Sequence, residues 1–224
     1  PHLTAFKEEL RSWFFYYFEP RERMRAATSV KEVRHVGLMG EELVAYLNTL
    51  RSLDPRQFTA VEKAMHALIP SVTGIKTEVN RIGEVELSLM EGAVAMPARV
   101  VSEGTLRVLG LLALAGVQEP PAVIGFEEPE NGVHPRRIRD IAKVLSARAE
   151  SGNTQLIVTT HSPILPDNVP PDCLFVCRKA QGATSIEPLE TWGPLGQAAG
   201  IDAALEEEAE LSVSRRMLRG DFDA

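Results

Sequence analysis

The apolar positions of this chain follow two different periods, and each period predicts a different kind of element. Apolar residues recur at helical spacing in residues 1–20, 41–52 and 55–68, and this spacing predicts helices. After residue 73 the apolar residues alternate with polar ones on both sides of a turn that contains Asn80 and Gly83. Alternation around such a turn predicts an antiparallel hairpin.

The helical stripe in residues 1–20 is rich in aromatic side chains. Its members are Leu3, Phe6, Leu10, Phe14 and Tyr17. A cluster of this kind is usually buried, so we predict a helix that packs in the core of an N-terminal helical lobe.

Residues 122–161 contain two apolar runs, and each run ends in polar residues. The first run ends in Glu127 and Glu128, and the second ends just before His161. Between them, residues 135–149 carry apolar side chains at helical spacing. The two runs lack polar alternation, which is expected of parallel strands buried on both faces. The stretch therefore predicts a strand-helix-strand crossover, and such sheets bind ligands beyond the carboxyl ends of their strands.

A second feature precedes this crossover in residues 100–116. A polar turn at residues 102–105 is followed by a helix that is apolar nearly all round, and such a helix is predicted to be buried. Its first turn offers unpaired backbone N–H groups and the positive end of the helix dipole, where an anion can bind. Beyond the crossover we expect a buried strand at residues 174–176, an edge strand at 183–186 and an acidic helix at 203–210.

The composition is that of a globular protein, and the overall charge gives no indication of nucleic-acid binding. The 224 residues are 44% hydrophobic and 25% charged, with a net charge of -7. The charge does not indicate a nucleic-acid-binding protein, although a local basic patch remains compatible with it. There is no secretory signal and no apolar run near about 18 residues, so we expect a cytoplasmic protein without a membrane partner.

The residues at the two strand ends have a recognisable chemistry. Of two adjacent carboxylates, Glu127 and Glu128, one can hold Mg²⁺ while the other deprotonates a nucleophilic water. His161, at the end of the neighbouring strand, can reach the same volume and hydrogen-bond a phosphate. The alternative is that all three side chains only cap a strand or a helix at a solvated edge.

Three segments together resemble a known family. They are SEGTLR, IGFEEPENGVHP and VTTHSP, in this order. They resemble the signature motif, the Walker B motif with its D-loop, and the switch histidine of ABC-type ATPases. The likeness is greatest to the RecF-like and SMC-like ATPases of bacterial DNA repair and phage defence, which are often classed as AAA-family ATPases.

The resemblance implies an α/β fold with an ABC-ATPase-like core. In that fold, parallel strands are covered by helices, and an N-terminal helical lobe and a small antiparallel hairpin are added. It divides the chain into residues 1–99, a helical lobe with the β-hairpin, and residues 100–224, the C-terminal part of the core. It also implies ATP and Mg²⁺ as cofactors and a head-to-tail homodimer that closes on the nucleotide.

Roles follow from the resemblance position by position. Glu127 matches the metal-binding acid of Walker B, Glu128 the catalytic base and His161 the switch histidine that contacts the γ-phosphate. The remaining matched residues are expected to contact nucleotide or cross the dimer interface: in the signature motif Ser102, Gly104 and Thr105, and in the D-loop Asn131 and His134.

The sequence departs from the family pattern at two positions. Glu127 stands where an Asp is usual, and its extra methylene shifts the carboxylate by about 1.5 Å, so metal contact is expected to be displaced. Glu103 stands where the signature motif usually has Gly. A carboxylate here would repel a polyphosphate unless it turns away or meets a cation.

The phosphate loop of the family is missing from the 224 residues. The nearest segment, GIKT at residues 74–77, has Ile75 between Gly74 and Lys76, and so it does not match G-x-x-x-x-G-K-[ST]. We therefore expect that this chain, which begins at Pro1, is the C-terminal part of a longer ATPase or joins a separate chain that supplies the loop. Alone it is expected to be inactive.

Two other functions remain open from the sequence. The chain can be a non-catalytic half-cassette that dimerises or regulates, or a subunit of a nuclease, since paired acids and a histidine also bind Mg²⁺ for phosphodiester cleavage. The resemblance also makes a nuclease or a toxin a possible partner.

Overall fold

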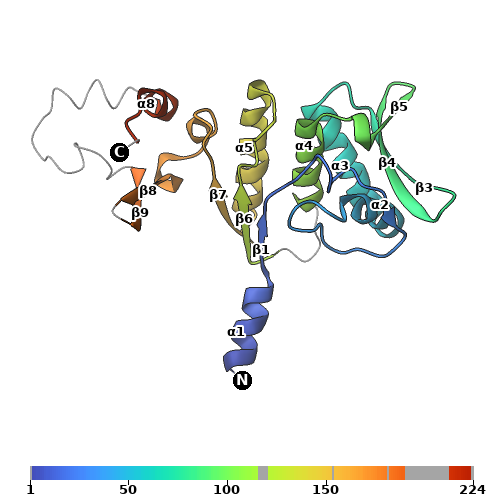
Figure 1. Cartoon of the computed structure of the whole chain (residues 1–224), viewed down its shortest axis with the longest axis horizontal. Coiled ribbons are helices and arrows are strands. Elements are labelled where there is room, and N and C mark those ends of the chain that lie inside the picture. The colour runs from blue at the N-terminus through green and yellow to red at the C-terminus, as the bar shows by residue number, and fades with distance from the viewer. Residues whose placement is uncertain (1, 116–120, 153, 181, 190–211, 223–224) are drawn as a thin grey trace, which may run out of the picture. The chain divides into compact units, whose positions relative to one another are not determined.

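The computed structural model describes residues 2–115, 121–152, 154–180, 182–189 and 212–222 (Figure 1). The chain splits into two compact units, Pro1–Thr160 and His161–Ala224. The boundary between residues 99 and 100 that the sequence predicts stays a prediction.

The first unit contains helices, a parallel sheet and an antiparallel sheet. Its helices are α1 (His2–Arg11), α2 (Leu43–Leu53), α3 (Pro55–Leu68), η1 (Ala98–Val100), α4 (Glu103–Ala115) and α5 (Pro135–Glu150). Its strands are β1 (Trp13–Tyr16), β2 (Thr28–Ser29), β3 (Gly74–Val79), β4 (Glu84–Glu91), β5 (Val94–Pro97), β6 (Val123–Glu127) and β7 (Gln155–Thr159).

A parallel sheet in the order β1-β6-β7 confirms the predicted crossover (Figure 1). The central strand β6 is buried except at Glu127, its last residue. The prediction that both crossover strands are buried is wrong for β7, in which Gln155, Ile157 and Thr159 are exposed. Among the described residues β7 lies at the edge of the sheet, so no strand covers its outer side.

The first helix ends earlier than its apolar stripe predicts. α1 stops at Arg11, and the next residues form β1, which pairs in parallel with β6. Aromatic residues favour strands, and here Tyr16 is buried and stacks on Phe126 with ring centroids 5.3 Å apart. The predicted burial of the helix is wrong, since every residue of α1 is exposed and Leu3 retains 84% of its accessible surface.

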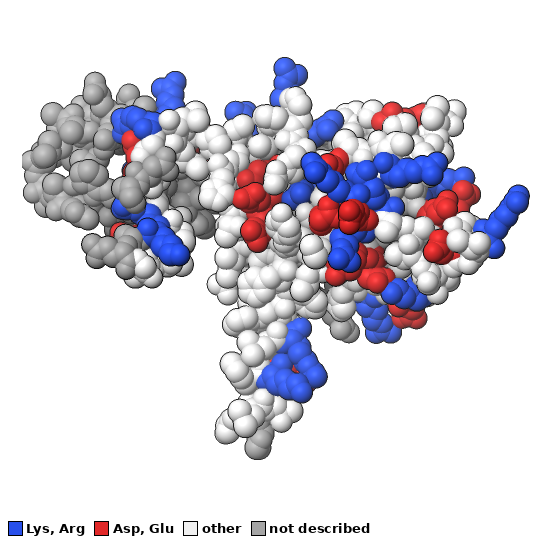
Figure 2. Space-filling model, viewed as in Figure 1, with Lys and Arg blue, Asp and Glu red and all other residues white. Residues whose placement is uncertain are grey.

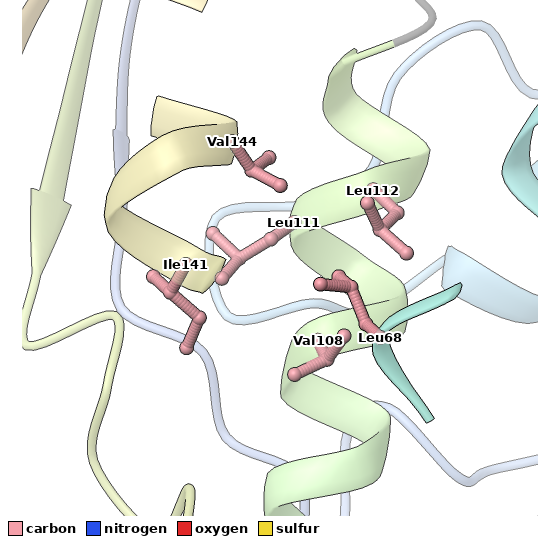
Figure 3. A pocket seen from close by; sticks show the side chains of 6 residues that line it. All are labelled: Leu68, Val108, Leu111, Leu112, Ile141 and Val144. Carbon is pink, nitrogen blue, oxygen red and sulfur yellow. The ribbon is translucent and has the colours of Figure 1, made fainter. Parts of the chain in front are cut away.

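The predicted hairpin is confirmed as β3 and β4, and β2 and β5 also pair with β4. Helices α2, α3, α4 and α5 pack in succession, and α5 also packs against β7. α4 is buried from Gly104 to Leu114, as predicted. Where α4 faces α5, a small pocket is lined by apolar side chains only: Leu68, Val108, Leu111, Leu112, Ile141 and Val144 (Figure 3). Such a lining does not suit a nucleotide phosphate.

The second unit contains the short helices η2 (Pro166–Asn168) and η3 (Pro171–Cys173), the antiparallel pair β8 (Phe175–Ala180) and β9 (Ala183–Pro188), and the helix α8 (Val213–Arg219). The prediction of a buried strand here is wrong, because Phe175 is 60% exposed and the strand pairs only with β9 among the described residues. The predicted acidic helix at 203–210 lies outside the described residues. In the part of the chain that is described, no helix is long and apolar enough to cross a membrane.

Candidate active site

The two adjacent acids lie where β6 ends and the chain turns. Glu128 has a φ of +46°, a left-handed conformation that is uncommon for a residue with a side chain. Two backbone hydrogen bonds hold this turn: Glu128 donates to Thr159 O over 3.0 Å, and Asn131 donates to Glu128 O over 3.0 Å. The Asn131 side chain also donates to Glu128 Oε2 over 3.3 Å. The Glu128 carboxylate is therefore anchored at the carboxyl edge of the sheet.

The turn continues through a third acid, which is buried. Glu130 is 6% exposed and accepts a hydrogen bond from the hydroxyl of Thr160. Its other oxygen, Oε2, has no hydrogen-bond partner among the residues that the structure describes. His134 then caps α5, because its Nδ1 accepts from the backbone N–H of Arg136 over 3.3 Å. Glu130 thus links the turn to the residue that follows β7.

Residues 102–105, which we call the signature turn, lead into helix α4. They pack against Gly132 and Val133. Ser102 accepts from the backbone N–H of Thr105 over 3.2 Å and donates to its hydroxyl over 2.8 Å. A Cβ on Gly104 would lie 2.4 Å from the backbone oxygen of Gly132, a distance that backbone atoms cannot tolerate. Glycine is therefore required at this position for the signature turn to touch residues 131–134.

A buried arginine, Arg107, connects helix α4 to the turn at Glu128. Arg107, one turn into α4, is 5% exposed, and its Nη1 donates to Glu128 O over 3.3 Å. Burial lowers the pKa of its guanidinium. The neighbouring groups that act in the opposite direction are Tyr17, Glu103, Glu130 and Glu128. Arg107 therefore supports the backbone of Glu128 with a charge that these acids balance.

The glutamate that replaces the signature glycine does meet a cation. Glu103 Oε1 lies 2.7 Å from Arg21 Nε, and the two side chains are 40% and 75% exposed. On the face of the molecule seen in Figure 2, Lys and Arg side chains lie beside Asp and Glu side chains. The repulsion expected of Glu103 is thus offset by an arginine from a distant part of the chain.

The structure brings together seven of the eight residues that the sequence predicts for the site, all in the first unit: Ser102, Gly104, Thr105, Glu127, Glu128, Asn131 and His134. The eighth, His161, is the first residue of the second unit, and its role stays a prediction.

Sequence reasoning missed three residues around the site: Arg107, Glu130 and Thr160. Arg107 had a visible signal, since it is the only charged residue after the first turn of an otherwise apolar helix. The contacts of Glu130 and Thr160 join distant segments and leave no local pattern. At residues 21–25 (RERMR) the sequence leaves a phosphate or nucleic-acid contact open but favours a solvated charged turn, and it does not indicate that Arg21 pairs with Glu103.

Glu127 and Glu128 can hold Mg²⁺ only together with other ligands, such as substrate phosphates and waters. Among the described residues no group of three or more His, Cys, Asp and Glu side chains could hold a metal ion. Mg²⁺ needs no such cage, because it is commonly bound by one or two carboxylates together with substrate phosphates and waters. Glu127 is exposed and Glu128 partly exposed at the end of β6, so both carboxylates are accessible for this arrangement.

Comparison with protein families and curated proteins gives two matches. The model of a family described as "AAA domain, putative AbiEii toxin, Type IV TA system" matches residues 6–167. Protein ea59 of Escherichia phage lambda is 29% identical over 97 residues, which are 42% of this chain and 18% of the phage protein. The chain thus spans less than a fifth of this relative.

Several solved structures of SMC heads share the fold. An SmcHead bound to the C-winged helix domain of ScpA matches with a TM-score of 0.51 and 16% identity, over 62% of this chain and 44% of that one. A structure described under ATP-driven dimerization and DNA stimulated activation of SMC ATPases matches with a TM-score of 0.51 and 16% identity, over 74% and 98%. The Smc head domain of Pyrococcus furiosus matches with a TM-score of 0.51 and 16% identity, over 73% and 40%. These matches confirm the predicted α/β fold.

Proposed function

The chain belongs to the family described as "AAA domain, putative AbiEii toxin, Type IV TA system", and we propose that it supplies the catalytic part of an ATPase that uses ATP and Mg²⁺. One observation carries the proposal. Glu128 directly follows the central strand in a left-handed turn, and its backbone is held by Thr159, Asn131 and Arg107. A fixed backbone, with the Asn131 side chain bonded to the carboxylate, suits a general base, whose position must be kept to within fractions of an ångström.

The chemistry assigned to this site is hydrolysis of the γ-phosphoryl group. A water attacks the phosphorus, the bond to the leaving ADP oxygen breaks, and Glu128 accepts the proton that the water loses. Asn131 donates to Glu128 Oε2 over 3.3 Å and so orients the carboxylate. Glu127 would hold Mg²⁺, which supplies charge neutralisation at the phosphates. His161 is assigned the hydrogen bond to the γ-phosphate.

The signature turn is assigned to the nucleotide bound by a second copy of the chain. Ser102, Gly104 and Thr105 would contact its phosphates, and residues 131–134 would cross the interface. The contact between Gly104 and Gly132 supports this assignment, because it makes the signature turn and the interface loop a single packed surface. A head-to-tail dimer would then close when nucleotide binds and open after hydrolysis.

The phosphate loop is assigned to another segment, in the same protein or in a separate chain, because the 224 residues contain no match to its motif. We assign the ATPase cycle to DNA repair or phage defence, with a nuclease or toxin as the partner that it controls. The family description names a putative AbiEii toxin of a Type IV TA system, and this supports the link to a toxin.

The test is the substitution Glu128→Gln in the protein that contains this chain together with its phosphate loop. The amide keeps the shape of the side chain but cannot accept the proton, so turnover is expected to fall by about a hundredfold or more while ATP still binds. Steady-state phosphate release and nucleotide retention on the purified protein measure the two effects.

The matched control is Glu150→Gln, at the exposed end of α5. It makes the same chemical change far along the helix from the catalytic turn, and its turnover is expected to equal that of the unmodified protein. Unchanged phosphate release in Glu128→Gln would sink the assignment of the base.

A further inference from the structure

The turn that carries Arg21 is built around one carboxylate. Glu19 accepts hydrogen bonds from the backbone N–H groups of Arg21, Glu22 and Arg23, at 3.0, 2.9 and 3.0 Å. Partial burial opposes the charge of Glu19, but these three hydrogen bonds outweigh it and lower the pKa of the carboxyl. The backbone of this arginine turn, residues 19–25, is therefore held in one conformation.

A second arginine ties the arginine turn to the signature motif. Arg25 donates through Nε to Pro20 O over 2.8 Å, through Nη1 to Arg99 O over 2.9 Å and through Nη2 to Val101 O over 3.4 Å. Val101 directly precedes Ser102. The position of Arg21 beside the signature motif thus depends on backbone contacts as well as on its own side chain.

The ion pair of Arg21 with Glu103 contributes little to folding stability, and in it Arg21 can exchange Glu103 for another anion. Both side chains are substantially exposed, at 75% and 40%, and exposed ion pairs contribute little to folding. Arg21 uses Nε in this contact, while a guanidinium carries five N–H donors in a plane that matches phosphate oxygens. A triphosphate carries several negative charges, so it competes well against one solvated carboxylate.

We propose that Arg21 contacts the phosphates of the nucleotide bound by the second copy of this chain, and that Glu103 holds its guanidinium in place until they arrive. The proposal rests on the function proposed above, in which Ser102 and Gly104 face that nucleotide. It explains how a glutamate is tolerated where the family has glycine. Arg21 and Glu103 together carry no net charge, so Glu103 does not repel the nucleotide as a lone carboxylate would.

The experiment measures dimerisation driven by ATP in the Glu128→Gln background, where hydrolysis is blocked. It uses the protein together with its phosphate loop and records the fraction of dimer by analytical ultracentrifugation as ATP is raised. Addition of Arg21→Gln is expected to raise the ATP concentration for half-maximal dimer by about tenfold, the equivalent of one charge-assisted hydrogen bond to phosphate. Addition of Arg23→Gln, an exposed neighbour on the same turn, is the matched control and is expected to change it by less than about twofold.

A second variant tests the role of Glu103 independently. Glu103→Gly restores the residue that the family pattern has and removes the competitor for Arg21, so the half-maximal ATP concentration is expected to fall by about threefold or more. Circular dichroism melting of each variant shows that the fold is intact.

The possible outcomes separate the two proposals. If Glu128→Gln alone forms no dimer with ATP, the proposed function is overturned and the role of Arg21 with it. If the dimer forms and Arg21→Gln and Arg23→Gln behave alike, or Glu103→Gly weakens the ATP response, only the role of Arg21 is overturned. A selective loss in Arg21→Gln together with a gain in Glu103→Gly supports it.

Discussion

Two turns in this molecule hold a glutamate beside an arginine, and they differ in burial. At the signature turn, Glu103 pairs with Arg21 on the surface, where both side chains are largely exposed. At the end of β6, Arg107 supports Glu128 from the interior, where it is 5% exposed. Water stabilises the separated charges of the first pair, so that pair can exchange partners. The second arginine has no such alternative and acts on the backbone of the turn.

The buried arginine also shows what a charge in the core requires. Burial disfavours the charged guanidinium of Arg107 and lowers its pKa, and the acids around it offset only part of that cost. One of these acids, Glu130, is itself buried and keeps only part of its hydrogen bonding. Removing Arg107 would leave Glu130 without its nearby positive charge.

The largest expected effect follows from this difference. Arg107→Met is expected to lower the free energy of unfolding by about 3 kcal/mol, because it strands a buried carboxylate and leaves the Glu128 carbonyl without its donor. Arg21→Met makes the same change at the exposed pair and is expected to cost less than about 1 kcal/mol. Urea unfolding monitored by circular dichroism gives both values.

A second substitution tests whether the lost stability comes from the unpaired charge of Glu130. Glu130→Gln, added to Arg107→Met, removes the stranded charge and is expected to restore part of the lost stability. Equal destabilisation by the two arginine substitutions would contradict the contrast between the turns.

The next effect concerns the contact that joins the turns. Gly104→Ala places a Cβ 2.4 Å from the backbone oxygen of Gly132, and so it must push residues 102–105 and residues 131–134 apart. We expect a loss of about 2 kcal/mol in the free energy of unfolding, as for other overpacked sites, despite the helix preference for alanine. In Gly74→Ala, where the nearest atom would be 3.5 Å away, stability is expected to be nearly unchanged. Thermal unfolding of Gly104→Ala and Gly74→Ala measures both effects. Unchanged stability in Gly104→Ala would show that residues 131–134 move aside without cost.

The smallest effect lies in the exposed turn and depends on pH. Glu19→Gln weakens the three hydrogen bonds that hold residues 19–25 and is expected to cost about 1 kcal/mol at pH 7. The folded protein lowers the pKa of Glu19 below its usual value of 4.5. The contribution of its charge is therefore complete above about pH 5 and is lost as the pH falls through the lowered pKa.

Unfolding titrations of Glu19→Gln and the unmodified protein at pH 7 and near pH 3 measure this difference. The difference in stability between the two proteins is expected to be smaller at the acidic pH than at pH 7. A gap that stays constant over this range would mean that the charge of Glu19 does not hold the turn.

The sequence correctly predicted much of the fold because the relevant patterns are local. The apolar run that ends in Glu127, the helix after Pro135 and the hairpin around Asn80 and Gly83 all occur where they were predicted. The prediction of an AAA-family domain is confirmed by the family match, and the predicted α/β fold by the similarity to SMC heads. Short motifs in a fixed order were sufficient for that.

The errors have a common cause, which is that burial depends on neighbours. The stripe from Leu3 to Tyr17 has one helical period, but the chain changes to strand β1, which pairs with β6. Of the stripe's members only Phe14 is partly buried, and Leu3, Phe6, Leu10 and Tyr17 are exposed. β7 has the composition of a buried strand, yet it lies at the edge of the described sheet. No single segment records which other segments lie beside it.

The sequence by itself determined the local elements and the order of the motif residues, because hydrophobic period, turn residues and helix starts act over a few positions. Only the tertiary structure decided that Arg21 meets Glu103, that Arg107 supports Glu128 and that Gly104 lies under Gly132. These contacts join segments far apart in the chain, and their strength depends on burial, which exists only once the segments have packed.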